Sequence, residues 1–251
     1  MMEKFIDIVS SVDLPEQINM LKFLQKLVDT NKKAVKLSNY VTVEQDYISE
    51  QSDNFKEIEK NLEDLKLWSS PRKGVSTVWL TLNDKPYTWM SAKGPVVNQS
   101  QSLVAAPAID RLRNKINYDK GLGFDSVLVT LFPSEKTTLS LHADDESTLD
   151  QTHPIGTFSV GAPRPVQFYR TTQHHSEAPL HEVLLHAGSL YIMHAGCQKL
   201  FKHRIPAGKF AGRRYSLSFR RLAQSSVPFP VQKVENKPSE NVVCKVEKQA
   251  S

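Results

Sequence analysis

One short segment carries two side chains whose types and spacing suit metal chemistry. His142 and Asp144 lie two residues apart in the sequence Leu-His-Ala-Asp-Asp-Glu. On a β-strand, residues i and i+2 point to the same face, so this imidazole and this carboxylate are expected to project together. They supply two members of a 2-His-1-carboxylate triad, which holds Fe(II) and leaves positions open for O2 and a co-substrate. Taken alone, the pattern also fits a polar turn after a strand.

A second imidazole has to come from elsewhere in the chain, which contains eight histidines. His203 lies inside an alternating run at 201–205, and a Pro-Ala-Gly loop separates this run from the next one. That spacing allows two neighbouring strands to return to the same mouth of a barrel. We therefore predict His203 as the second imidazole, with His194, which flanks a predicted strand, as the alternative.

The run that follows this loop has one polar face and one apolar face. Arginines at both ends with serines between them share the first face, and aromatic and aliphatic residues share the second: Arg214, Ser216, Ser218 and Arg220 against Tyr215, Leu217 and Phe219. An unpaired buried guanidinium is costly, so arginines inside a strand require an anionic partner. A dicarboxylate suits them because the planar guanidinium fork matches a carboxylate. The alternative is a basic strand edge exposed to solvent.

The elements that must position these residues are mostly short strands. From residue 124 onward the chain alternates apolar and polar side chains in short runs, which Gly, Pro and polar residues separate. We predict strands at 124–132, 154–160, 166–170, 182–185, 189–193 and 199–205, followed by the arginine run. About eight short strands favour a mainly β fold, a double-stranded β-helix (jelly roll), with flanking N-terminal helices.

The flanking helices are predicted mainly in the first part of the chain. Apolar residues recur at helical spacing after Pro15 and again from about Asn54, where Glu57 completes a capping-box pattern. A further helix follows Pro107. We therefore divide the chain into a helical N-terminal extension that packs on the core, a jelly-roll domain, and a C-terminal tail that is expected to be disordered, at 1–72, 73–222 and 223–251.

The composition is that of an ordinary globular protein with a basic balance. Hydrophobic residues make up 39% of the 251 residues, and the formal net charge of +5 mildly favours an anionic partner. Two cysteines that lie far apart predict no disulfide framework and a reducing compartment. The apolar run at 5–9 is too short for a signal peptide or a membrane span. We expect a monomer inside the cell, in the nucleus or cytoplasm, without membrane association.

The order and spacing of these motifs resemble the AlkB family of Fe(II)- and 2-oxoglutarate-dependent dioxygenases. The resemblance extends from about residue 79 to 222 and includes the His-Ala-Asp-Asp-Glu segment, the distant histidine and the arginine run. It implies that His142, Asp144 and His203 bind Fe(2+). It also implies that Arg220 lies near the proximal carboxylate of 2-oxoglutarate and holds the aspartate.

The resemblance further implies how the rest of 2-oxoglutarate is bound. Arg214 would pair with the distal carboxylate, and Ser216 stands where the family often has Asn, with a shorter hydrogen-bonding group. The family usually has Asn-x-Tyr where this chain has Thr130-Leu-Phe132. Thr130 keeps a hydroxyl, but Phe132 cannot form a hydrogen bond through its side chain. This departure bears on the affinity for the co-substrate.

For the substrate, the resemblance implies methylated DNA or RNA. Family members of this type use O2 to remove N-methyl groups from bases and release succinate, CO2 and formaldehyde. Tyr87 and Trp89 share one face of a predicted strand and correspond to aromatic residues that cover the base, since a flat ring stacks on any base. Asp145 would contact the exocyclic amine of the base, and Arg170 would reach the substrate. A base in a duplex would have to be flipped out.

Two other functions stay open on the sequence alone. In the first, the oxygenase acts on a protein or small molecule. In the second, the jelly roll is a weakly active nucleic-acid-binding module, which the departure from the family pattern at 130–132 suggests. The segment from Lys199 to Arg221 has eight Lys or Arg residues and no Asp or Glu. This favours nucleic acid because some of these cations can contact phosphates, although a solvated basic face has the same composition.

Overall fold

The structure is a computed structural model, and it describes residues 37–66, 68–72, 74–91, 94–174, 176–209 and 211–226. Eight strands form the centre of the fold: β7 (Ser126–Phe132), β8 (Leu139–His142), β9 (Ile155–Gly161), β10 (Arg164–Arg170), β11 (His181–Leu185), β12 (Leu190–Met193), β13 (Phe201–Ile205) and β14 (Arg214–Arg220). Every strand predicted from residue 124 onward is present, with small differences at the ends. The predicted helix after Pro15 and most of the predicted tail lie outside the described residues.

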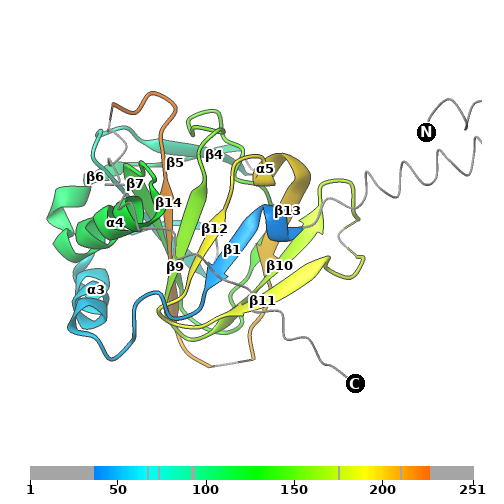
Figure 1. Cartoon of the computed structure of the whole chain (residues 1–251), viewed down its shortest axis with the longest axis horizontal. Helices are drawn as coiled ribbons and strands as arrows, with labels where there is room; N and C mark the ends of the chain where they lie inside the picture. Colours follow the sequence, from blue (N-terminus) through cyan, green and yellow to red (C-terminus); the bar gives the residue numbers. More distant parts are fainter. Residues whose placement is uncertain are drawn as a thin grey trace, which may run out of the picture.

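These eight strands are divided between two facing sheets, as Figure 1 shows. The larger sheet contains them in the order β12-β9-β14-β7, and the smaller sheet has the order β11-β10-β13-β8. The chain crosses from one sheet to the other at every connection except β10–β11, and the pairings are antiparallel. This arrangement is a double-stranded β-helix. The predicted fold class, mainly β with a jelly-roll core, is confirmed.

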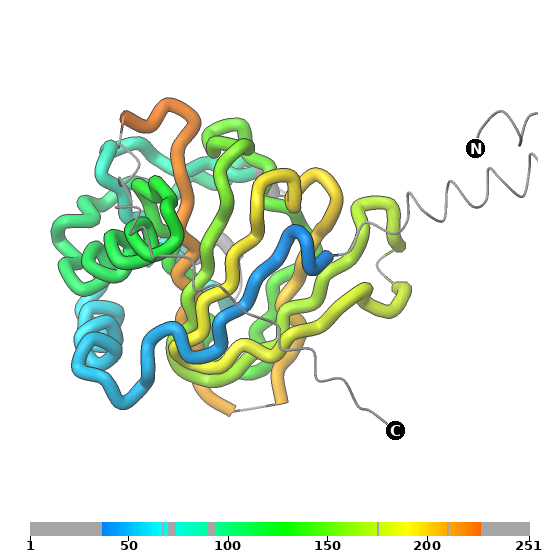
Figure 2. Tube along the Cα trace, viewed as in Figure 1, coloured from blue at the N-terminus to red at the C-terminus, as the bar shows by residue number. Residues whose placement is uncertain are grey.

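Strands from the first part of the chain extend the larger sheet at both edges. β1 (Val41–Glu44) pairs with β12, and β3 (Val75–Thr81) pairs with β7 and also with β2 (Ser69–Arg72) and β6 (Ser100–Ser102). In Figure 2 the blue β1 segment runs beside the yellow β12 segment. Strands on both sides of the predicted domain boundary at residue 72 therefore belong to one sheet, and the domain division itself remains a prediction.

Two helices cover the outer face of the larger sheet (Figure 1). α3 (Asp53–Asp64) and α4 (Pro107–Lys120) contribute apolar side chains to one buried cluster with the strands, which includes Phe55, Ile58, Leu62, Ile109, Leu112, Ile116, Phe158, Leu217 and Phe219. The capping residue of α3 is Ser52 rather than the predicted Asn54, because the Ser52 hydroxyl accepts the Phe55 N–H. The helices thus hold the larger sheet from outside, and a second apolar cluster joins its inner face to the smaller sheet, with residues that include Phe132, Ile155, Met193, Val166 and Phe201.

Smaller elements complete the described fold. β4 (Tyr87–Ser91) and β5 (Gly94–Asn98) form a two-stranded sheet of their own, which we call the ribbon. Short helices occur at η1 (Leu37–Asn39), η2 (Leu103–Ala105) and α5 (Cys197–Leu200). The α5 helix and the second ribbon strand were not predicted. In the described part of the chain, no helix has the length and hydropathy needed to cross a membrane.

Candidate active site

A cavity of about 390 Å³ opens between the two sheets, and the ribbon contributes to its wall. Most of the residues predicted from the sequence to form the site line this cavity: Tyr87, Trp89, Thr130, His142, Asp144, Asp145, His203, Ser216 and Arg220. Arg214 and Arg170 do not belong to the wall. On β7 and β14 the period of two holds, since the alternating residues pack in the core. It does not hold at 142–147, where consecutive residues line the cavity.

His142, Asp144 and His203 converge at one point of the cavity. His142 ends β8 and lies directly opposite His203 of β13 in the antiparallel pairing, with ring centroids 4.3 Å apart. Asp144 follows just beyond the strand, and its Oδ1 is 3.7 Å from His142 Nε2. One ligand atom from each of the three residues lies within 4.8 Å of the others, so this donor set fits a single metal ion. Cross-strand register, together with the i, i+2 spacing, brings the three together.

The imidazole of His203 is suited to metal binding because it presents a neutral nitrogen. Burial, followed by the charge of His142, lowers the pKa of His203 to about 3, so His203 is neutral near pH 7. His142 Nδ1 lies 2.8 Å from the Ser140 carbonyl oxygen, which accepts a hydrogen bond from the Nδ1–H tautomer. In that tautomer Nε2 carries the lone pair and is turned toward Asp144, as a histidine ligand requires.

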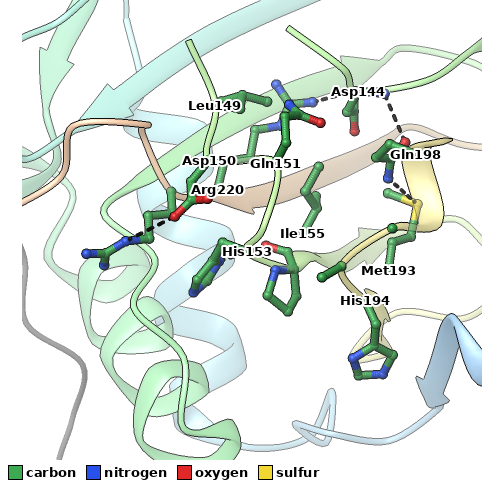
Figure 3. A pocket seen from close by; sticks show the side chains of 14 residues that line it. Asp144, Leu149, Asp150, Gln151, His153, Ile155, Met193, His194, Gln198 and Arg220 are labelled. Atoms are coloured by element: carbon green, nitrogen blue, oxygen red, sulfur yellow. Dashed lines mark hydrogen bonds and ion pairs between the residues drawn. The ribbon is translucent and has the colours of Figure 1, made fainter. Parts of the chain in front are cut away.

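Asp144 is buried and held from two sides. Arg220 Nη2 donates to Asp144 Oδ1 at 2.9 Å, and both side chains are almost fully buried. Burial alone raises the pKa of this carboxyl, but the charge of Arg220 and those of the two histidines lower it to about 2. Gln198 Oε1 accepts the Asp144 backbone N–H at 2.9 Å, and the Gln198 amide lies 3.3 Å from Met193 Sδ, as Figure 3 shows. The carboxylate is therefore ionised and fixed in position.

Arg214 lies in the interior with no carboxylate paired to it among the described residues. Its side chain is fully buried, and Nη2 donates to Ser159 Oγ at 2.9 Å, whereas Nε and Nη1 have no hydrogen-bond partner there. Nε and Nη1 of Arg220 are buried without a partner in the same way. Burial lowers the pKa of Arg214 to about 10, which still leaves it charged at pH 7. Buried unsatisfied donors are costly, and carboxylate oxygens are the acceptors that best match a guanidinium group.

Phe132, the departure from the family pattern, contacts two guanidinium groups. Its ring centroid is 5.6 Å from Arg214 Cζ and 5.7 Å from Arg164 Cζ, so each arginine makes a cation–π contact with it. Arg164 is held in turn by the carbonyl oxygens of Ser134 and Pro206. Phe132 thus helps to position Arg214, although it offers no hydroxyl to a ligand.

The ribbon places aromatic side chains on the cavity wall. Tyr87 is buried, stacks on Trp79 with centroids 4.8 Å apart, and lies 4.8 Å from Arg220 Cζ. Trp89 is only partly buried, so part of its indole remains accessible from the cavity. Asp145 is exposed on the same wall. This placement agrees with the predicted contacts to a base, and those contacts stay predictions.

Arg170 and His194 lie away from the triad. Arg170 is the last residue of β10, and its guanidinium lies 5.9 Å from an aromatic ring of β13. His194 Nε2 lies 3.2 Å from Thr42 Oγ1, and its ring points away from Asp144 in Figure 3. His203, and not the alternative His194, therefore completes the group of three.

Three residues of the site were not predicted from the sequence. Glu146 lines the cavity two residues after Asp144, so the period of two that applies to the aspartate was a usable signal; burial raises its pKa. Tyr191 lines the cavity from β12, where alternation alone does not distinguish an inner tyrosine from a core one. Gln198 comes from α5, and no sequence pattern marks it.

Comparisons with known proteins agree with this chemistry. The family model described as the 2OG-Fe(II) oxygenase superfamily matches residues 20–220. Proteins named alpha-ketoglutarate-dependent dioxygenase alkB homolog 3 are 29% identical over 105 residues in Homo sapiens and Bos taurus, which is 40% of this chain and 37% of theirs. The Rattus norvegicus protein of that name is 28% identical over 120 residues, 45% of this chain and 41% of its own.

These matches cover about two fifths of the relatives' length. A solved structure described as "The structure of OsALKBH1" aligns with 72% of this chain and 97% of its own, at 18% identity and a TM-score of 0.48. The resemblance to the AlkB family that the sequence predicted is confirmed by the named relatives.

Proposed function

Because this chain belongs to the 2OG-Fe(II) oxygenase superfamily, we propose that it removes N-methyl groups from the bases of DNA or RNA. Fe(2+) and 2-oxoglutarate are the cofactors of this family. The observation that carries the proposal is one cavity in which the His-Asp-His group lies together with the aromatic ribbon. In the overall reaction, O2 and 2-oxoglutarate are consumed, and the methyl carbon is hydroxylated. The hydroxymethyl group then leaves as formaldehyde, with succinate and CO2 as the other products.

We assign the metal to His142, Asp144 and His203, whose ligand atoms lie within 4.8 Å of one another. Iron bound there supplies the oxidising chemistry by activating O2. Arg220 keeps the Asp144 carboxylate ionised and oriented through the 2.9 Å hydrogen bond. The remaining buried N–H groups of Arg220 are supplied to the nearer carboxylate of 2-oxoglutarate.

We assign the distal carboxylate of 2-oxoglutarate to Arg214, whose Nε and Nη1 are buried without a partner among the described residues. Ser216 pairs with Thr130 on one side and with Ser159 on the other. Their hydroxyls form a polar row between the two arginines of β14, and Thr130 and Ser216 line the cavity. Such a row lets the middle of a short diacid lie against hydrogen-bonding groups.

The substrate base is assigned to the space beside the ribbon. Trp89 offers an accessible indole, and stacking of one base on an aromatic side chain contributes about 1–3 kcal/mol. Asp145 and Glu146 line the same wall and supply carboxylate oxygens that accept hydrogen bonds from an exocyclic amine. Aromatic stacking together with carboxylate acceptors favours a base over an aliphatic side chain, which needs neither.

Contacts with phosphates are assigned to exposed cations of the basic segment. Lys199 and Lys209 are exposed. Arg204 donates to Gln167 Oε1 and Arg213 contacts Glu63, so these arginines also have structural partners. Phosphate contacts provide affinity without sequence preference, and they make binding depend on salt.

Release of formaldehyde and succinate tests the proposal directly. The purified, iron-loaded chain is given matched single- and double-stranded DNA and RNA that carry 1-methyladenine or 3-methylcytosine. We expect turnover that requires both Fe(II) and 2-oxoglutarate, and Asp144→Ala is expected to lower it more than about a hundredfold, since even the outer partners of metal ligands matter by 10–100-fold. Trp89→Ala should raise the KM for the oligonucleotide and leave 2-oxoglutarate binding intact.

Each other result has a definite meaning. No turnover on any methylated oligonucleotide contradicts the proposal. Consumption of 2-oxoglutarate without oligonucleotide binding indicates a protein or small-molecule substrate, and oligonucleotide binding without consumption of 2-oxoglutarate indicates a weakly active binding module. We further propose that residues 73–222 form the oxygenase domain with 1–72 as its extension. The monomeric state and the location in the nucleus or cytoplasm stay predictions.

A further inference from the structure

The ribbon leaves and rejoins the rest of the protein at its root, which consists of Tyr87 and Asn98. Tyr87 is the first residue of the ribbon and Asn98 the last, and the two are direct partners in the antiparallel pairing. Direct partners point to the same face of a ribbon, and so do residues two apart on one strand. Tyr87, Trp89 and Asn98 therefore share one face. Burial agrees with this, since Asn98 is 1% exposed and the preceding Val97 is 47% exposed.

Asn98 is held by two hydroxyl groups of the larger sheet. Thr77 of β3 donates from Oγ1 to Asn98 Oδ1 at 2.7 Å, and Ser69 Oγ of β2 lies 2.8 Å from the same oxygen. The two hydroxyl oxygens are 2.9 Å apart, because Ser69 and Thr77 are partners across these strands. Asn98 Nδ2 has no hydrogen-bond partner among the described residues, so the amide is held through its oxygen. Thr77 and Asn98 are both buried, and an acceptor that loses its donor in such a place is costly.

Strand register explains why Thr77 and Asn98 meet. The chain continues from the ribbon into β6, which pairs in parallel with β3 and places Ser100 opposite Trp79. Continuing this register by two residues places Asn98 opposite Thr77. β3 and β5 are not paired through their backbones, so at this step the side chains make the connection.

The other half of the root is held by aromatic stacking on the same strand. Tyr87 stacks on Trp79 with ring centroids 4.8 Å apart, and Trp79 lies two residues after Thr77 on β3. A single contact leaves a hairpin free to turn about that contact, whereas two contacts fix its direction. Trp89 lies two residues beyond Tyr87, so the position of its indole at the cavity depends on the direction that the root sets.

We propose that Thr77 and Asn98 are positioning residues for the aromatic wall of the cavity. Their hydrogen bond fixes the direction of the ribbon and so sets where the indole of Trp89 lies. The consequence for the substrate rests on the proposed function, in which a base stacks on this indole. The anchor itself is a property of the protein without any ligand. Neither Thr77 nor Asn98 is assigned to the metal, to 2-oxoglutarate or to the base.

Hydrogen exchange of the ribbon amides, at 87–91 and 94–98, tests the anchor in the full chain without ligand. Thr77→Val removes the hydroxyl and keeps a branched side chain. At short labelling times, when β9 and β14 are still protected, ribbon amides should exchange about fivefold faster, the factor for one typical hydrogen bond. Thr77→Ser keeps the hydroxyl and should exchange like the parent chain. Ribbon exchange in Thr77→Val within about twofold of the parent would overturn the proposal.

Thr157→Val is the matched control. Thr157 is also buried in the larger sheet, and its Oγ1 lies 3.3 Å from Ser218 Oγ. Its strand, β9, is separated from β3 by β14 and β7. Removing this hydroxyl should leave exchange in the ribbon unchanged. If it accelerates the ribbon as much as Thr77→Val does, the loss of any buried hydroxyl has the effect, which contradicts the proposal.

Asn98→Ala tests the same hydrogen bond from the side of the ribbon. It removes the acceptor that Thr77 and Ser69 share, so ribbon exchange should accelerate at least as much as in Thr77→Val. Adding Thr77→Val to Asn98→Ala should then have little further effect, because the two residues act through one interaction. Fully additive effects of the two substitutions would show that they act separately, and the proposal would be wrong.

Enzyme kinetics show whether the anchor matters for the substrate. Thr77→Val should raise the KM for a methylated oligonucleotide about fivefold, since a smaller fraction of the chain holds Trp89 in place, and Thr77→Ser should restore it. The Kd for 2-oxoglutarate, measured with Mn(II) and without O2, should change by less than about twofold. An unchanged KM in a variant with faster ribbon exchange overturns the positioning role. A parent chain that demethylates no oligonucleotide overturns only the proposed function, because the exchange experiment needs no substrate.

Discussion

The two arginines of β14 lie at the two ends of the polar face of this strand, and their surroundings differ. Arg220, at the metal end, donates to the ionised Asp144 carboxylate at 2.9 Å. Arg214, at the far end, has a hydrogen bond to the hydroxyl of Ser159 and a cation–π contact with Phe132. The protein thus neutralises the charge at one end with its own carboxylate. At the other end no carboxylate of the described residues is paired with the guanidinium, so the protein does not neutralise the buried charge of Arg214 in the same way.

The largest expected effect concerns the stability of the metal-free protein. Arg220→Met leaves the buried Asp144 carboxylate unpaired, and removing one member of a buried ion pair costs about 3–5 kcal/mol. Arg214→Met removes a buried charge that has no carboxylate partner among the described residues, so the free energy of unfolding should stay the same or rise. Urea unfolding followed by circular dichroism measures both. Equal losses in the two variants would show that the two ends do not differ.

The second prediction concerns how much 2-oxoglutarate stabilises the protein and how far this depends on Arg214. With Mn(II) present, 2-oxoglutarate at about a hundred times its Kd should stabilise the parent chain by roughly 2.7 kcal/mol. Arg214→Met should lose most of this gain at the same concentration, because the far carboxylate has lost its partner. Arg213→Met is the control, since Arg213 is exposed and contacts Glu63 on the surface. Full stabilisation of Arg214→Met would contradict the assignment of the far end.

The smallest expected effect is a pH dependence that arises outside the two ends of β14, at His153. His153 is buried, accepts the Gly123 N–H at Nε2, and has Nδ1 2.9 Å from the Pro154 carbonyl oxygen. Burial lowers its pKa below the usual 6.5, and the nearby Arg221 lowers it further, whereas the Pro154 hydrogen bond and the Asp150 charge oppose this.

As the pH drops below about 6.5, His153 is protonated in the unfolded chain while it is still neutral in the folded chain. The free energy of unfolding therefore falls with the pH in this range. The slope from one such group is at most about 1.4 kcal/mol per pH unit. His153→Gln should lose less stability than the parent between pH 7 and pH 5.5 when unfolding is measured at both. A parallel loss in the two proteins would assign the pH dependence to other groups.

The sequence alone predicts those features that depend on a period of two. The i, i+2 spacing of His142 and Asp144 and the two faces of β14 follow from strand geometry. The cavity wall contains both metal-site residues and the polar face of β14 from Ser216 to Arg220, but not Arg214. The same rule shows that Phe132 shares a face with Thr130, and both line the cavity. Local patterns of this kind need only that the segment is a strand.

Features that depend on strand order could not be predicted in this way. Tyr191 lines the cavity because β12 pairs with β9 at the centre of the larger sheet, a relation that alternation does not contain. Arg170 alternates correctly with the inner residues of β10 but ends the strand, where its guanidinium lies by an aromatic ring of β13. The capping residue Ser52 was missed because two residues, Ser52 and Asn54, both suit a helix start.

The ribbon is attached to the rest of the molecule in an uneven way. Tyr87 is anchored, since it stacks on Trp79 and lies over Arg220, whereas Trp89, two residues on, is only partly covered. β4 and β5 share hydrogen bonds with each other and belong to neither large sheet. If the ribbon contacts the substrate as proposed, replacing the outer half of this hairpin while Tyr87 is kept should change substrate preference and leave the His-Asp-His group intact.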